Sequence, residues 1–172
     1  MRDRRFIAVH RGGPLNKVSH AFLARWAADC AEDVLHLFQR RNSDDRPKKA
    51  IEIARQWAGG SVRTGVAMKA SLAAHAAARE EKDKAAIAVA RAAVHAVATA
   101  HAADHSMGAL LYALKAMEAA GLDSTSTLQK ALAKLPEDLR DQVEYGVSVR
   151  LGKLRVNASL QTSTSSAPAN DG

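Results

Sequence analysis

The chain has 172 residues, a formal net charge of +7 and 47% hydrophobic residues. This length and composition fit one globular domain with a buried core and exclude a chain that is disordered throughout. No uncharged apolar stretch of about 18 residues occurs, so we expect no membrane span and no membrane partner. The single cysteine, Cys30, cannot form an internal disulfide, and no cleavable signal peptide is visible, so we expect a cytoplasmic location.

The positive charge is concentrated at the N-terminal end of the chain. Residues 1–63 carry 13 Lys and Arg against 7 Asp and Glu, whereas residues 122–172 carry 6 of each. Basic clusters attract polyanions, so nucleic-acid binding stays open as an alternative to a solvated face that aids solubility. The two clusters are formed by Arg2, Arg4, Arg5 and Arg11, and by Arg40, Arg41, Arg46, Lys48 and Lys49.

Apolar residues recur with helical spacing along the chain, and no long alternation of apolar and polar residues predicts a sheet. The Asp45-Arg46-Pro47 motif suits the start of a helix, and Gly59-Gly60 suits its end. We therefore expect an all-α fold, either a single-domain helical bundle or a short helical array, with six to seven helices. The expected helices begin near Leu15 or Val18, Asp45, Arg63, Lys82, Ser106, Ser126 and Pro136. The second helix is expected to end at Gly59-Gly60. The other six are expected to end, in chain order, near Gln39, Glu81, His105, Ala120, Lys134 and Leu151.

Two boundaries follow from composition. Residues 1–157 are expected to form the helical domain, and residues 158–172, rich in Ser, Thr and Ala, a disordered tail. The fourth and fifth helices are separated near Asp104, or they bend into each other without a break.

The centre of the chain is rich in alanine, with 23 alanines in the 54 residues from Ala67 to Ala120. Alanine favours helix and lets helix axes approach closely. The expected helix over residues 82–105 is apolar nearly all round, which is typical of a helix at the centre of a bundle.

The polar residues of this apolar region form a candidate site. Arg91, His95 and Thr99 are four residues apart and share one helical face. An enclosed guanidinium needs a partner because an unpaired buried charge is costly, and Asp29 and Asp33 are candidate buried acidic partners. The cluster is either an internal network that fixes helix register or a pocket for a ligand or partner group. It comprises His75, Arg79, Arg91, His95, Thr99, His101, His105 and Tyr112.

The sequence assigns no catalytic residue, no cofactor and no metal site, so we expect a protein that is not an enzyme. The central His/Arg cluster keeps a small-ligand or metal-binding protein, which could be an enzyme, as an alternative. Within it, His101 and His105 have the spacing of two imidazoles on one helical face, which is the spacing of metal ligands. No zinc-protease, di-iron or phosphate-loop motif accompanies them. Cys30 lies on an apolar stripe, which predicts a buried thiol, and Trp26 and Trp57 are interpreted as core anchors.

Four segments occur in a recognisable order. They are Trp26-Ala27-Ala28-Asp29-Cys30-Ala31-Glu32 with Val34-Leu35 and Leu37-Phe38, Asp45-Arg46-Pro47 with Ala50-Ile51 and Ala54-Arg55-x-Trp57, Ala74 to Arg79, and Ala90 to His101 followed by His105 and Tyr112. Together they resemble the all-helical family of bacterial immunity proteins from toxin–immunity systems, over about residues 6 to 155. The resemblance implies a small protein that binds and neutralises a cognate toxin and carries no catalytic residues.

The charge of the chain bears on the toxin that such a protein would bind. Inhibitors of toxins that cut nucleic acid often present acidic surfaces, whereas this chain is basic overall. Three explanations stay open: the toxin is acidic, the toxin is not a nuclease, or a local acidic patch of Asp29, Glu32 and Asp33 binds it.

Overall fold

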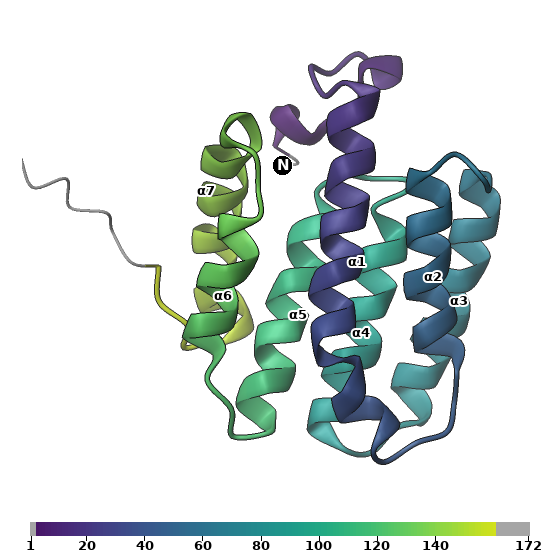
Figure 1. The fold of residues 1–172 in the computed structure, drawn as a ribbon, viewed down its shortest axis with the longest axis vertical. Helices are drawn as coiled ribbons and strands as arrows, with labels where there is room; N and C mark the ends of the chain where they lie inside the picture. The colour runs from purple at the N-terminus through teal and green to yellow at the C-terminus, as the bar shows by residue number, and fades with distance from the viewer. Residues whose placement is uncertain (1–2, 161–172) are drawn as a thin grey trace, which may run out of the picture.

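The structure, a computed structural model, describes residues 3–160, and residues 1–2 and 161–172 lie outside the described part. Seven α-helices follow two short 3-10 helices in this range (Figure 1), which confirms the predicted all-α bundle. None of the helices within residues 3–160 combines the length and the apolarity needed to cross a bilayer. The elements are η1 (Arg4–Phe6), η2 (Val9–Arg11), α1 (Lys17–Gln39), α2 (Arg46–Ala58), α3 (Thr64–Glu80), α4 (Lys84–Ala98), α5 (His105–Ala119), α6 (Ser124–Ala133) and α7 (Glu137–Leu154).

Local signals account for most helix boundaries. Asn16 and Asp83 accept hydrogen bonds from backbone amides in the first turns of α1 and α4, at 2.8 and 2.9 Å. Pro47 lies in the first turn of α2, where the Asp44 carboxylate accepts a hydrogen bond from the Arg46 amide at 2.9 Å. The glycines that follow α2 and α5 include Gly60 and Gly121, both with positive φ, as expected for residues that end a helix.

The end of α4 differs from the prediction. The helix was expected to continue to His105, but it ends at Ala98, and residues 99–104 form a turn before α5. The Thr99 hydroxyl donates to the His95 carbonyl at 3.0 Å, and amides at the helix end make short-range bonds three residues back. Hydroxyl bonds of this kind compete with the helical backbone pattern, while alanines continue the apolar periodicity through the turn.

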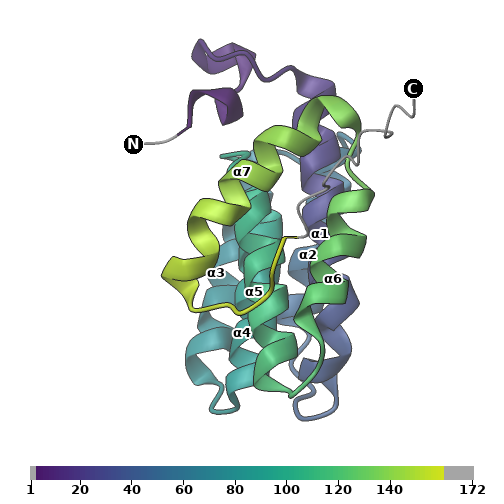
Figure 2. The ribbon, with the colours of Figure 1, turned by 90° about the vertical axis from the view of Figure 1, so that its left-hand side faces the viewer.

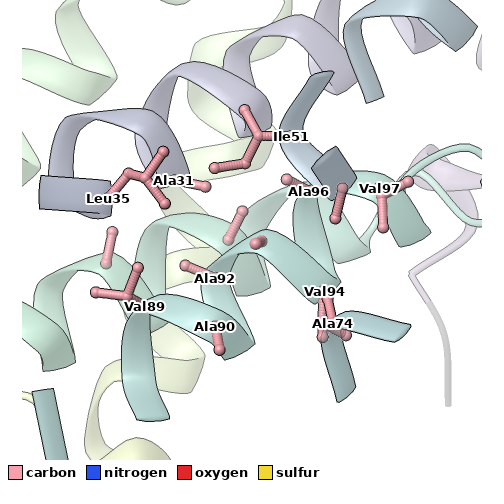
Figure 3. Close-up of a cluster of buried hydrophobic side chains, with 14 of the residues drawn as sticks. Ala31, Leu35, Ile51, Ala74, Val89, Ala90, Ala92, Val94, Ala96 and Val97 are labelled. Atoms are coloured by element: carbon pink, nitrogen blue, oxygen red, sulfur yellow. The ribbon is translucent and has the colours of Figure 1, made fainter. Parts of the chain in front are cut away.

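Helix α4 lies at the centre of the bundle, as its apolar surface predicts. It contacts α1, α2, α3 and α5, and Figure 1 shows α1 and α2 in front of it. In Figure 3, Ala31 and Leu35 of α1 and Ile51 of α2 face the alanine and valine side chains of α4. Ala92 and Val97 of α4 are fully buried there. Small side chains on α4 let its neighbours pack closely around it.

Helices α6 and α7 form a flank on α5 (Figures 1 and 2). A second core joins them to α5, with Leu110 and Leu114 of α5 packed in one buried cluster with Leu128 and Val143. Trp26 of α1 is buried in this core, and its indole N–H donates to a carbonyl of α6, Ala131 O, at 2.8 Å. Trp26 is therefore a core anchor, as predicted.

Packing continues beyond the end of α7. Val156 and Ala158 are buried against the second core, and the Asn157 amide donates to Glu118 Oε1 at 2.7 Å. The packed chain thus extends past the predicted domain end at residue 157 and reaches Leu160. The rest of the predicted tail, residues 161–172, lies outside the described residues, so its disorder stays a prediction.

The N-terminal segment folds over the start of α1. The Val9 amide donates to Leu15 O at 2.9 Å, and the Leu15 amide donates to Ile7 O at 3.0 Å. A Cβ on Gly13 would collide with the Ile7 carbonyl, so this closure needs glycine. The turn that contains Gly13 therefore brings the segment back onto the end of the bundle (Figure 1).

Candidate functional site

Helices α4 and α5 bring the aromatic members of the predicted cluster into one row. The His95 ring stacks on Tyr112, with 5.1 Å between ring centroids and 20° between planes. Its Nδ1 lies 3.0 Å from His105 Nδ1, so one ring donates and the other accepts. The His101 ring lies 4.9 Å from the His105 ring. Three histidines and one tyrosine thus form a continuous row of rings between the turn at residues 99–104 and the middle of α5.

Gly108 makes room for this row. A Cβ on Gly108 would overlap the His95 ring and would lie 2.9 Å from its Cε1. Sequence reasoning missed Gly108, although an isolated glycine inside a predicted helix is a signal of close packing.

The row lies beside positive charge. Burial above all lowers the pKa of His95 to about 4, and His105, His75 and Arg91 act in the same direction. Burial also lowers the pKa of His75, followed by the charges of Arg91 and Arg79. His75 and His95 are therefore neutral at pH 7.

The two arginines of the cluster reach solvent. Arg79 of α3 is exposed and Arg91 of α4 is half-buried. Neither forms an ion pair with any side chain of residues 3–160. The cluster is thus a face of α3, α4 and α5 that opens to solvent at Arg79, with the His95 ring largely enclosed within it. We call the group of His75, Arg79, Arg91, His95, His105 and Tyr112 the cationic face.

The prediction that Asp29 and Asp33 are buried acidic partners of this cluster is wrong. Arg55 donates to Asp29 at 2.8 Å and to Glu32 at 2.8 Å, and Asp33 lies 3.7 Å from Lys134. The side chains of Asp29 and Asp33 are 48% and 54% exposed. Residues three and four apart share one side of a helix, and here that is the solvent side of α1.

Thr99 does not belong to the cationic face. Its side chain is fully buried, and its carbonyl accepts a hydrogen bond from His20 Nε2 at 2.7 Å. With its hydroxyl on the His95 carbonyl, Thr99 joins the end of α4 to α1. Its role here is structural.

The described residues provide no metal centre. Within residues 3–160, no group of three or more His, Cys, Asp and Glu side chains is arranged to hold a metal ion. His101 and His105, the pair considered from the sequence, lie ring against ring with 52° between their planes. Cys30 is buried, as predicted, and burial raises the pKa of its thiol far above its usual range.

The basic clusters found in the sequence are partly neutralised by carboxylates of the same chain. Arg46 pairs with Asp44, 2.8 Å from Nε to Oδ2, and with Glu80. Lys49 lies 2.7 Å from Asp45. These contacts leave less positive charge for a nucleic acid than the composition indicates. Further pairs are Arg5 with Asp3, Arg41 with Asp83 and Lys48 with Glu52, and Arg2 lies outside the described residues.

A separate cavity of about 630 Å³ lies at the N-terminal end of α1, between η2, the first turns of α1 and the connection from α2 to α3. We call it the N-terminal cavity. Trp57 forms one wall, half-buried, with its indole N–H donating to Thr64 Oγ1 at 3.1 Å. Trp57 is therefore a cavity wall, and it also packs, partly buried, against the core around α4, so its prediction as a core anchor is confirmed in part.

His20 also lines the N-terminal cavity, and sequence reasoning missed it. It is 6% exposed, and burial is the main cause that lowers its pKa. Its position three and four residues before Leu23 and Ala24, on the apolar stripe of α1, is the signal that could have found it.

Comparison with known proteins agrees with the resemblance seen in the sequence. Residues 13–142, about three quarters of the chain, match one protein family, described as Imm-5 like putative immunity protein. The match spans α1 to α6 and includes the whole cationic face. No curated protein and no solved structure matches the chain. The chain belongs to the family of Imm-5 like putative immunity proteins.

Proposed function

We propose that this protein is an immunity protein that binds and neutralises a cognate bacterial toxin and carries out no reaction of its own. Membership of the family supports the coarse function. The observation that carries the proposed surface is the pair Arg79 and Arg91. Both charges act on His75, and neither guanidinium forms an ion pair with a carboxylate of residues 3–160.

Cations that form no ion pair on an accessible face favour an acidic partner surface. The half-buried rings of Tyr112 and His95 add flat contact area beside them, a composition typical of interface centres. We therefore infer that the toxin presents carboxylates to the cationic face.

The acidic patch on α1 offers less to a partner. Arg55 already binds both Asp29 and Glu32, and Lys134 lies near Asp33. A basic toxin would have to compete with these internal cations. Among the three explanations considered for the basic charge, the contacts favour an acidic toxin.

Co-expression with the toxic protein encoded by a neighbouring gene tests the proposal. The wild-type chain is expected to restore growth, and Arg79→Glu is expected to lose at least about tenfold in toxin affinity because it opposes carboxylates on the partner. Arg63→Glu, which makes the same charge change at the other end of α3, is the matched control and should retain rescue. Binding is measured by calorimetry with the purified toxin.

Other outcomes would support the alternatives. If the wild-type chain failed to restore growth, the proposed function would be contradicted. If Arg79→Glu and Arg63→Glu lost toxin affinity equally, the proposed surface would be contradicted. Stoichiometric zinc, iron or manganese in the purified protein would instead support a metal-dependent protein. Binding to DNA or RNA that weakens steeply with salt would support the nucleic-acid alternative.

A further inference from the structure

The N-terminal cavity has the size and lining of a small-molecule site. Its volume of about 630 Å³ lies within the range of cavities that enclose ligands, and it is larger than any one side chain would fill. Its walls are mainly apolar, with Ala8, Leu15, Trp57 and Val62 among them. We propose that it binds a small aromatic carboxylate that carries one N–H or O–H group.

The wall formed by Trp57 favours a flat aromatic body. The hydrogen bond from its indole N–H to Thr64 Oγ1 holds the ring, and His20 packs on it with 4.9 Å between centroids. Aromatic rings attract each other in offset or tilted geometry at such distances. Ala21 and Ala58, which also line the cavity, are too small to fill the space beside the indole.

The charge of the lining favours a carboxylate. His10 and Lys17 line the cavity and are exposed, and none of its lining residues is acidic. Neither of the two forms an ion pair with a described side chain of residues 3–160. A carboxylate near the ammonium of Lys17 would receive a charge-assisted hydrogen bond, which is stronger than a neutral one.

The buried imidazole of His20 specifies the donor group. Its Nε2 must donate to Thr99 O, 2.7 Å away, because a carbonyl oxygen can only accept. In the neutral ring Nδ1 is then an acceptor, and it has no hydrogen bond with any of residues 3–160. A ligand N–H or O–H would satisfy this acceptor, which is why the proposed ligand combines a donor with a carboxylate.

Calorimetric titration of the full chain with three related probes tests the proposed chemistry. Indole-3-acetate has the ring, the N–H and the carboxylate, and it is expected to bind with Kd below about 1 mM. Indole-3-acetamide lacks the charge, and naphthalene-1-acetate lacks the donor. Each is expected to bind at least about threefold more weakly.

Matched variants locate the site. Ala21→Phe places a bulky ring in the N-terminal cavity and should abolish binding, whereas Ala133→Phe places one in a second cavity of about 630 Å³ beside α6 and should not affect it. Lys17→Gln should weaken indole-3-acetate about threefold or more and leave indole-3-acetamide unchanged. Lys130→Gln, in the second cavity, is its control.

The proposal is independent of the immunity function, because its test uses no toxin. Absence of saturable binding by indole-3-acetate at millimolar concentration would overturn it. Equal affinity for all three probes would overturn the proposed ligand class. Binding that survives Ala21→Phe but is lost in Ala133→Phe would place the site in the other cavity and would also overturn it.

Discussion

At the scale of single residues, the pKa of His95 on the cationic face lies far below its ordinary value. Its ring is enclosed between Tyr112 and His105 and lies near Arg91, and burial lowers its pKa to about 4. Protonation of His95 would place a positive charge near the Arg91 guanidinium, within an apolar setting. His95 therefore stabilises the fold only in its neutral form.

This property predicts loss of stability in mild acid. An unfolded histidine has a pKa of about 6.5, so between pH 6.5 and 4 the unfolded chain binds a proton that folded His95 does not. The free energy of unfolding is fully retained above this window and falls as the pH decreases through it, by about 1.4 kcal/mol at pH 5.5. Urea denaturation at pH 7 and pH 5.5 measures the effect.

The histidine is tested by substitution. His95→Gln is expected to lose about 1 kcal/mol of this pH dependence, whereas His36→Gln, on the exposed side of α1, should keep it. Burial lowers the pKa of His20 and His75 too, so part of the dependence should remain in both variants. An unchanged pH dependence in His95→Gln would show that the ring is not buried neutral.

At the scale of helices, the contact between α4 and α5 decides the shape of the cationic face. The His95 ring fits against the backbone of α5 because Gly108 has no Cβ. A larger residue there would push the ring away from Tyr112 and open the row toward solvent. One backbone position on α5 thus controls the enclosure of a side chain on α4.

Substitution of Gly108 tests this control. Gly108→Ala is expected to be less stable than Gly152→Ala by about 1–3 kcal/mol, because the added Cβ overlaps His95 whereas nothing lies near Gly152. Both changes remove a glycine from a helix, so their effects on helix propensity are comparable. NMR titration should also show the pKa of His95 rising toward 6.5 in Gly108→Ala. Equal stability with an unchanged pKa would contradict this packing.

At the scale of the whole molecule, two cores meet at α5. One surrounds α4, and the other joins α5 to α6, α7 and the segment after α7. Val156 and Ala158 are buried in the second core, and the Asn157 amide binds Glu118 of α5. The segment that follows α7 therefore contributes to the stability of the domain.

Two truncations test this contribution. A chain that ends at Arg155 is expected to lose about 2–3 kcal/mol of unfolding free energy, because it loses the burial of Val156 and Ala158 and a hydrogen bond to a carboxylate. A chain that ends at Leu160 keeps these contacts and should match the full chain in denaturant midpoint. Equal stability of both truncated chains would show that the segment is dispensable.

The sequence predicted the helices better than their contacts. The helical spacing of apolar residues on α1, Pro47 in α2 and Gly59-Gly60 after α2 are local signals, and each lies where the structure requires it. The end of α4 was missed because alanines continue the helical periodicity through residues 99–104, where the backbone turns. Periodicity reports which residues are apolar, and it does not report where backbone hydrogen bonding changes.

In the candidate site, too, local spacing was predicted correctly and contacts between distant residues were not. The spacing of His101 and His105 and the polar stripe on α4 identified residues that the structure brings together. Asp29 was predicted to pair with an arginine of the central cluster, but it pairs with Arg55, 26 positions away in the chain. Any cation that lies nearby in space satisfies a carboxylate equally well, so the sequence does not identify the partner. His20 and Trp57 meet at a cavity that depends on the path of the N-terminal segment.

Composition and spacing along the chain were sufficient for the helical fold, the alanine-rich centre and the family resemblance, because helix formation and burial of a stripe depend on neighbours within a few turns. Which cations form no ion pair, which ring fits against Gly108 and where a cavity opens became clear from the packed molecule. These features depend on contacts between residues distant in sequence, whose geometry is set when all seven described helices pack together.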